Sequence, residues 1–316
     1  MRFLPIDAAT YERSALHRDE RIWPETNCYV DLWIEVLHAL GHDPRAGLAF
    51  TLSADHHGDQ WQFIKYQLDD LRDLYALDVH ELNPWRGLDV HIEQQLREGN
   101  LLTAEVDAWH LPDTAGVSYR IEHTKTSIVA NMIDTNERRL GYFHGASYYE
   151  LEGEDFDGVL ARGGPPTSLA PYVERIHIRD ALGAPEPDAV IDQVRQHLSR
   201  RPVDNPATRL AQQFVEDLPW LQAGGVDRFH QYAFATMRQC GSCAELAASL
   251  CDWLEDHGAP TGEAQPAFLR VAELTKTMQF KLARAAAGRA IDHESLLSEI
   301  SCNWQRGIDA IAHRYG

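Results

Sequence analysis

Hydrophobic residues recur at helical spacing early in the chain. In residues 29–40 (YVDLWIEVLHAL), Val30, Trp33 and Leu37 fall on one helical face, and Gly41 ends the pattern. The same period predicts two further helices, over residues 68–76 and 86–98.

Beyond residue 100 the pattern becomes that of β-strands. Residues 101–107 (LLTAEVD) are typical of a strand. Residues 126–134 and 138–144 flank the turn-rich DTNE, which predicts a β-hairpin, and residues 172–178 predict a further strand. The N-terminal half is therefore predicted to mix helices and strands.

Two proline-rich polar segments interrupt the chain. They occupy residues 183–188 (GAPEPD) and 202–206 (PVDNP), and nearly everything beyond them has a helical period. The helices predicted there cover residues 206–222, 226–256, 265–287 and 293–315. We therefore predict an α+β domain over residues 1–184 and an all-helical domain over residues 185–316, the second serving as a lid or as a docking surface.

The charge balance argues against several classes of partner. The 316 residues include 29 Lys and Arg against 48 Asp and Glu, a formal net charge of −19. Such a chain repels phosphate backbones and anionic membranes, so neither nucleic acid nor membrane is an expected partner. No run approaches the roughly 18 apolar residues of a membrane helix, and no export signal is visible. Together with an odd number of cysteines, five, this favours free thiols in the cytoplasm.

Cys28 is the first candidate for chemistry. It stands directly ahead of the first predicted helix, in PETNCYVDLW, where Thr26 or Asn27 can cap that helix. A thiol at a helix N-terminus lies at the positive end of the helix dipole, which favours the reactive thiolate. A buried structural cysteine is the alternative interpretation.

Residues around the predicted hairpin could complete a Cys–His site. His123 lies at the start of the first strand and can accept the proton of a cysteine at a neighbouring helix end. His144 ends the second strand and can bond the far nitrogen of His123, which fixes its tautomer. Asp107 ends a strand and is a candidate for substrate binding, with a loop-capping carboxylate as the alternative. Asp134 is a weaker choice for the orienting residue, because about 35 Å of strand separates it from His123.

Two other motifs could suggest a metal site. The segment DHHGDQW, residues 55–61, holds two histidines and two aspartates. Adjacent histidines on a strand point to opposite faces, so we predict no metal there, and Gln60 and Trp61 become candidates to line a substrate cleft. The CxxC of residues 240–243 is a lone pair that continues to Cys251 at helical spacing, which predicts core packing.

The order of these motifs resembles the papain-like fold. A cysteine at a helix start is followed by a strand leading into VDAWHLP, by HTKTSIVANMID and by LGYFHGASYYELEGEDF. More closely, this order resembles the N-terminal domain of the butirosin-biosynthesis protein H family, an acyltransferase that moves an aminoacyl group from a carrier-protein thioester to an amine. The matching positions are Cys28, His123, and Asp107 with Leu111 and Pro112, while His144 and Gly145 stand where that family has Asp-Pro.

Over nearly its whole length the chain also resembles a bacterial family, domain of unknown function 1839 (DUF1839). The resembling segments are TNCYVDLWIEVLHALG, GDQWQF, HTKTSIVANMID, LGYFHG and YAFATMRQCG with QFKLARA. They fall in both predicted domains.

The likeness to the acyltransferase implies a covalent mechanism on a papain-like N-terminal domain. Cys28 would attack a phosphopantetheine thioester on an acyl carrier protein, and His123 would take the thiol proton and later one from a small-molecule amine. His144 would orient His123. The N–H of Cys28 and a donor from Asn27 or Gln60 would form an oxyanion hole. No cofactor is expected beyond the phosphopantetheine arm of the donor.

Two other functions fit the same residues. A cysteine peptidase or amidase would use Cys28 and His123 for hydrolysis, and a non-catalytic scaffold would retain only the papain-like fold. A histidine at position 144, where the family has aspartate, favours the scaffold. Docking of an acidic carrier protein would need clustered basic residues, with a solvated helix face as the alternative interpretation. The candidates are Lys276, Lys281, Arg284, Arg289 and residues 199–201.

Overall fold

The chain folds into two compact units, seen in a computed structural model that describes residues 1–162, 170–179 and 183–316. The sheet unit comprises Met1–Arg18, Cys28–Pro44 and Leu68–Ala184, and the helical unit comprises Asp19–Asn27, Arg45–Gln67 and Pro185–Gly316. The sequence prediction assigned all of residues 1–184 to one domain. Two of its segments, residues 19–27 and 45–67, instead pack with the C-terminal helices.

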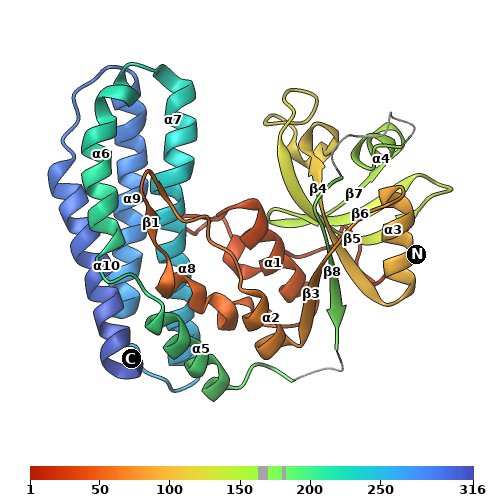
Figure 1. The fold of residues 1–316 in the computed structure, drawn as a ribbon, viewed down its shortest axis with the longest axis horizontal. Coiled ribbons are helices and arrows are strands. Elements are labelled where there is room, and N and C mark those ends of the chain that lie inside the picture. The colour runs from red at the N-terminus through yellow and green to blue at the C-terminus, as the bar shows by residue number, and fades with distance from the viewer. Residues whose placement is uncertain (163–169, 180–182) are drawn as a thin grey trace. The chain divides into compact units, whose positions relative to one another are not determined.

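The sheet unit is built on six strands in the order β3-β8-β4-β5-β6-β7, all paired antiparallel (Figure 1). The strands are β3 (Leu77–Leu82), β4 (Asn100–Asp107), β5 (Lys125–Asp134), β6 (Arg139–His144), β7 (Ser147–Glu152) and β8 (Val173–Ile178). Its helices are α1 (Cys28–Ala39), α2 (Leu68–Tyr75), α3 (Leu88–Arg97) and α4 (Glu154–Val159), with short 3-10 turns η1 (Ala15–His17), η3 (Ala108–His110) and η4 (Pro112–Thr114).

Helix α1 is buried along most of its length. Val30, Trp33 and Leu37, the residues whose spacing predicted it, are all inaccessible to solvent. The helix packs against β5, β6 and β7, while α3 packs against β4 and β5. Burial of one apolar helix face against a sheet is what fixes the position of the residue that begins the helix, Cys28.

The strand registers bring several strand ends together. Asp107, the last residue of β4, pairs with Lys125, the first of β5. Strand β6 ends at His144, one residue beyond the pair Val129 and Phe143, so it finishes beside the beginning of β5. We call this edge, where β4 and β6 finish and β5 begins, the site end of the sheet.

The helical unit contains the two-stranded ribbon β1 (His56–His57) and β2 (Gln60–Trp61) and a set of packed helices (Figure 1). The α8 helix packs against α9, and α10 packs against α9 and α6. The helical segments are η2 (Pro44–Ser53), α5 (Pro187–Ser199), α6 (Pro206–Gln222), α7 (Gly225–Ala233), the π-turn η5 (Phe234–Arg238), α8 (Gln239–Asp256), α9 (Ala264–Ala286) and α10 (Glu294–Tyr315).

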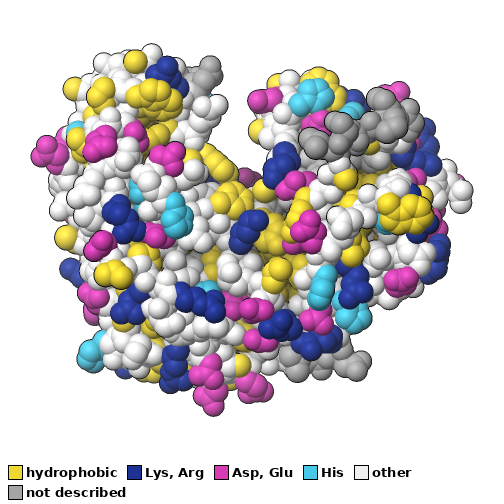
Figure 2. Space-filling model, in the orientation of Figure 1, with side chains coloured by type: hydrophobic (Ala, Val, Ile, Leu, Met, Phe, Trp, Pro, Cys, Tyr) yellow, Lys and Arg dark blue, Asp and Glu magenta, His cyan; other side chains and the backbone are white. Residues whose placement is uncertain are grey.

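Aromatic residues of the helical unit divide between core and surface. Phe214 and Phe268 are fully buried, whereas Trp220, Phe234 and Phe280 are exposed. On the face that Figure 2 displays, hydrophobic side chains gather over the end of this unit where α6 meets α7, and acidic and basic side chains are otherwise interspersed.

The predicted mixed α+β class, with a helical C-terminal part, is confirmed. Among the described helices, none combines the length and the apolar character needed to cross a membrane.

Candidate functional site

Cys28 begins α1 and is partly buried against the first residues of β5. Burial raises the pKa of its thiol, and the charge of Asp31 acts in the same direction. The charge of Lys125, a hydrogen bond with the Thr126 hydroxyl and a hydrogen bond from the Ser127 N–H oppose this shift without cancelling it. The sequence suggested a thiol activated by the helix dipole. In the folded chain burial has the larger effect, so the resting group is the thiol.

His123 is held in one orientation by Asp107. Its Nδ1 lies 2.6 Å from Asp107 Oδ2, and its ring stacks on Trp109 with centroids 4.5 Å apart and planes at 11°. The Trp109 N–H donates to the other carboxylate oxygen at 3.0 Å. Burial raises the pKa of Asp107, but these hydrogen bonds outweigh it and leave the pKa below its ordinary value. Nδ1 is thus occupied by Asp107, and Nε2 is the ring nitrogen that can exchange a proton with a bound molecule.

His144 forms a second histidine–aspartate pair. Its Nδ1 lies 2.5 Å from Asp113 Oδ2, and its Nε2 lies 2.8 Å from the hydroxyl of Thr126. Tyr142 donates its hydroxyl to Asp113 Oδ1 at 2.5 Å. Both ring nitrogens of His144 are therefore used within this cluster. The sequence suggested that His144 orients His123. In the structure, Asp107 holds His123 instead.

Asp113, Thr126 and Tyr142 were missed by the sequence reasoning. Asp113 lies in η4, on the turn after β4, and reaches a histidine 31 positions later in the chain. The motif VDAWHLPDT contains both Asp107 and Asp113, so an acidic residue at each end of a short turn was the signal available. Which histidine each one meets depends on how the turn folds back on β6.

A groove of about 1050 Å³ opens at the site end of the sheet. Asp107, His123 and Lys125 line it, together with the exposed Trp85 and with Tyr172. Lys125 is paired with Glu105 at 2.6 Å. Cys28 is not among the described residues that line this groove, although its thiol contacts Thr126, the neighbour of Lys125 on β5.

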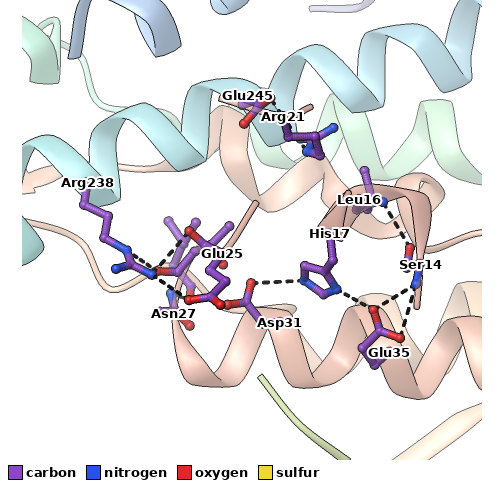
Figure 3. A network of polar contacts seen from close by, with 12 residues as sticks. Ser14, Leu16, His17, Arg21, Glu25, Asn27, Asp31, Glu35, Arg238 and Glu245 are labelled. Carbon is purple, nitrogen blue, oxygen red and sulfur yellow. Dashed lines mark hydrogen bonds and ion pairs between the residues drawn. The ribbon is translucent and has the colours of Figure 1, made fainter. Parts of the chain in front are cut away.

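A buried charge network anchors the helix that carries Cys28 (Figure 3). His17 Nδ1 contacts Glu35 Oε1, and its Nε2 lies 3.4 Å from Asp31 Oδ1. Burial lowers the pKa of His17, but the hydrogen bonds to the two carboxylates outweigh it and raise the pKa to about 9. The protonated imidazole therefore ties η1 to two successive turns of α1. Ser14 adds a backbone N–H to Glu35 at 3.0 Å.

The remaining candidates of the sequence lie in the helical unit. The side-chain amide of Asn27 is buried and donates to the Ile64 carbonyl at 3.1 Å and to Gln239 Oε1 at 3.2 Å. Trp61 is 1% exposed and packs edge-on against Trp304. These contacts make Asn27 and Trp61 part of the packed interior of the helical unit. Gln60, by contrast, is exposed on β2.

The histidine-rich and cysteine-rich motifs take structural positions. His56 is buried and His57 is exposed, on opposite faces of β1. Across the described residues, no group of three or more His, Cys, Asp or Glu side chains is arranged to hold a metal ion. The three cysteines that share one face of α8 are fully buried, as their spacing predicted, whereas Cys302 is exposed.

The fold and these clusters define an α+β protein with a helix-initial cysteine and two histidine–aspartate pairs at one end of its sheet. The chain belongs to the DUF1839 family. The model of the DUF1839 N-terminal domain matches residues 12–178, and that of the DUF1839 C-terminal domain matches residues 184–313. No curated protein matches the chain.

Proposed function

We propose that the protein is a cysteine-dependent acyltransferase with a papain-like catalytic arrangement. Cys28 is the nucleophile, and His123 is the general base. The observation that carries the proposal is the pair of His123 and Asp107, joined at 2.6 Å on the wall of a groove, at the same end of the sheet as a helix-initial cysteine. Acyl transfer requires an oriented base together with a nucleophile, and we infer that this end of the sheet provides both.

The reaction has two steps that balance without a redox partner. The Cys28 thiol gives its proton to a histidine of the site and forms a bond to the acyl carbon of a thioester, and the donor's sulfur leaves and takes up that proton. An amine then forms a bond to the same carbon and gives a proton to Nε2 of His123 as the bond to the Cys28 sulfur breaks. The proton on His123 then restores the Cys28 thiol. The positive end of the α1 dipole, where Cys28 lies, favours the negative oxygen of each tetrahedral intermediate.

A thioester donor fits the state of the nucleophile. Because burial raises the pKa of Cys28, the resting thiol reacts poorly with unactivated amides. Exchange between two thioesters is nearly balanced in energy, so an activated donor compensates for a weak nucleophile. The volume of the groove is at the upper end of the range typical of ligand sites, and an extended phosphopantetheine arm needs such room.

The carrier protein that brings this arm is acidic, so it would dock on a basic surface of this protein. Lys276, on α9, lies 4.2 Å from the centroid of the Trp23 ring, and Lys281 donates to the Asp292 carbonyl at 2.5 Å. Burial lowers the pKa of Lys276. These two lysines are committed to the fold of the helical unit, which leaves the exposed Arg284 and Arg289 as the docking candidates among the described residues of this stripe.

The test follows the products of a small donor. The protein is mixed with an aminoacyl N-acetylcysteamine thioester and an excess of a primary amine, and the products are separated by mass. Acyl transfer predicts an amide that requires Cys28 and His123. Free acid alone, at every amine concentration, would identify a hydrolase that uses the same residues. No product of either kind, with the donor intact, would favour a scaffold and would overturn the proposal.

A further inference from the structure

The thiol of Cys28 is connected to a histidine through the contacts of one side chain. Thr126 hydrogen-bonds the thiol and also lies 2.8 Å from His144 Nε2. His144 in turn lies 2.5 Å from Asp113. The side chains of His144 and Asp113 are only 11% and 4% exposed, so the chain of contacts is shielded from solvent.

The partners of Asp113 fix the direction of each hydrogen bond. A carboxylate only accepts, so Tyr142 donates its O–H to Asp113, and His144 presents an Nδ1–H to the same group. In a neutral imidazole the other nitrogen, Nε2, is then an acceptor. The Thr126 hydroxyl must donate to it. The lone pairs of that oxygen remain able to accept the S–H of Cys28.

We propose that the proton of Cys28 leaves through Thr126 to the buried pair of His144 and Asp113. The S–H bond breaks and a new O–H bond forms on Thr126, whose original O–H bond breaks as an N–H bond forms on His144 Nε2. The products are a thiolate and an imidazolium, so charge and atoms balance. This inference rests on the acyltransferase proposal and deepens it.

The thiolate formed in this way is stabilised by the same neighbours. After the transfer, the Thr126 hydroxyl points its hydrogen at the sulfur, and the Ser127 N–H donates to it as well. Asp113 offsets the charge of the imidazolium, as an aspartate does beside a catalytic histidine. The pair of His123 and Asp107 is then available for the second step, in which the acceptor amine loses its proton.

The two histidines thus act in different steps, His144 on the thiol proton and His123 on the acceptor amine. His123 lies in the wall of the groove with a side chain that is 70% exposed, where an acceptor amine enters. His144 lies in a shielded cluster that reaches the nucleophile through one hydroxyl. A single base serving both steps would have to face the sulfur and the acceptor in turn, and the separate hydrogen-bond networks remove that requirement.

The experiment compares Thr126→Val, which is nearly isosteric but has no hydroxyl, with Thr126→Ser, which restores it. The readout is the rate at which Cys28 is acylated by an aminoacyl N-acetylcysteamine thioester, followed by intact mass from acidic to alkaline pH. We expect Thr126→Val to lower the rate at neutral pH by about 100-fold and Thr126→Ser to restore most of it. The remaining activity of Thr126→Val should rise only at higher pH, where the thiol ionises without help. Lys125 and Asp31, the charged groups that face the thiol from β5 and α1, are unchanged in both variants.

Thr277→Val, on α9, is the matched control, because it removes an exposed threonine hydroxyl that takes no part in the site. It should leave the acylation of Cys28 at the wild-type rate. If Thr126→Val is acylated at the wild-type rate with an unchanged pH profile, the relay is overturned although the acyltransferase proposal stands. If the wild type is not acylated, the acyltransferase proposal fails. The relay is then tested by iodoacetamide labelling of Cys28 in the same variants, where an equal rate in wild type and Thr126→Val overturns it.

Discussion

Replacement of Asp107 by asparagine isolates the role of the first histidine–aspartate pair. The change keeps the size of the side chain but removes the negative charge that holds His123 Nδ1 at 2.6 Å. An amide can present its NH₂ group to that nitrogen, which would favour the wrong tautomer and place a hydrogen on Nε2. His123 could then no longer take a proton from the acceptor amine.

The effects on stability and on catalysis should separate clearly. The side chains of His123 and Asp107 are 70% and 39% exposed, and pairs with this exposure contribute at most about 1 kcal/mol to folding. The stacking on Trp109 is retained in the variant. Loss of an orienting carboxylate, by contrast, lowers turnover by about 10²- to 10⁴-fold when the histidine is the base. The variant should therefore be folded and slow.

The assay measures amide formation from a thioester under saturating amine, alongside thermal unfolding. We expect Asp107→Asn to lower kcat by at least about 100-fold with a shift in Tm of only a few degrees. Acylation of Cys28 should continue at nearly the wild-type rate, because the thiol proton passes to the pair of His144 and Asp113. A variant with wild-type kcat would refute the assignment of His123 as base, and a parallel loss of kcat and of folded protein would make Asp107 a structural residue.

Other parts of the structure make predictions of the same kind. His17→Gln leaves two buried carboxylates without their cation and should cost on the order of 3 kcal/mol at pH 6 in urea unfolding. Because the pKa of His17 is raised to about 9 in the folded state, its contribution is complete below its ordinary pKa and is lost as the pH rises through 9, so wild type and variant should converge at alkaline pH. A difference that grows with pH would contradict this. In native protein at neutral pH, iodoacetamide should label Cys302 first, Cys28 next, and the three buried cysteines of α8 last, as peptide mapping can verify. Labelling of Cys28 after the α8 cysteines would remove it as nucleophile. Arg284→Glu with Arg289→Glu should raise KM for a carrier-bound donor at low salt but leave turnover of the small thioester unchanged. Equal effects on both donors would exclude docking at this surface.

Local patterns predicted most of the fold because each element buries a continuous face. The helix predicted over residues 29–40 begins at Cys28, and the strands on either side of DTNE form the expected hairpin of β5 and β6. The edge strands β3 and β7 were not predicted, since polar residues interrupt their alternation in LDVHEL and SYYELE. Helix α5 was not predicted from the sequence. Its first residue, a proline, lies within a segment whose other residues indicate a turn.

The site was less accessible to sequence reasoning than the fold. The histidines and Asp107 were found because they stand at strand ends, but their pairing depends on turns that bring distant residues together. Asp113 meets His144 only because η4 folds back toward β6. The ionisation of Cys28 depends in the same way on tertiary packing, since burial against β5 outweighs the helix dipole that the sequence alone suggests.

The central claim is that Cys28 carries the acyl group, and intact mass tests it most directly. Wild-type protein, Cys28→Ala and the matched control Cys302→Ala are each mixed with an aminoacyl N-acetylcysteamine thioester, quenched in acid and weighed. We predict a gain of one acyl group on the wild type and on Cys302→Ala, none on Cys28→Ala, and loss of the added mass when an amine is supplied. An adduct that persists in Cys28→Ala, or no adduct on the wild type, would contradict the account.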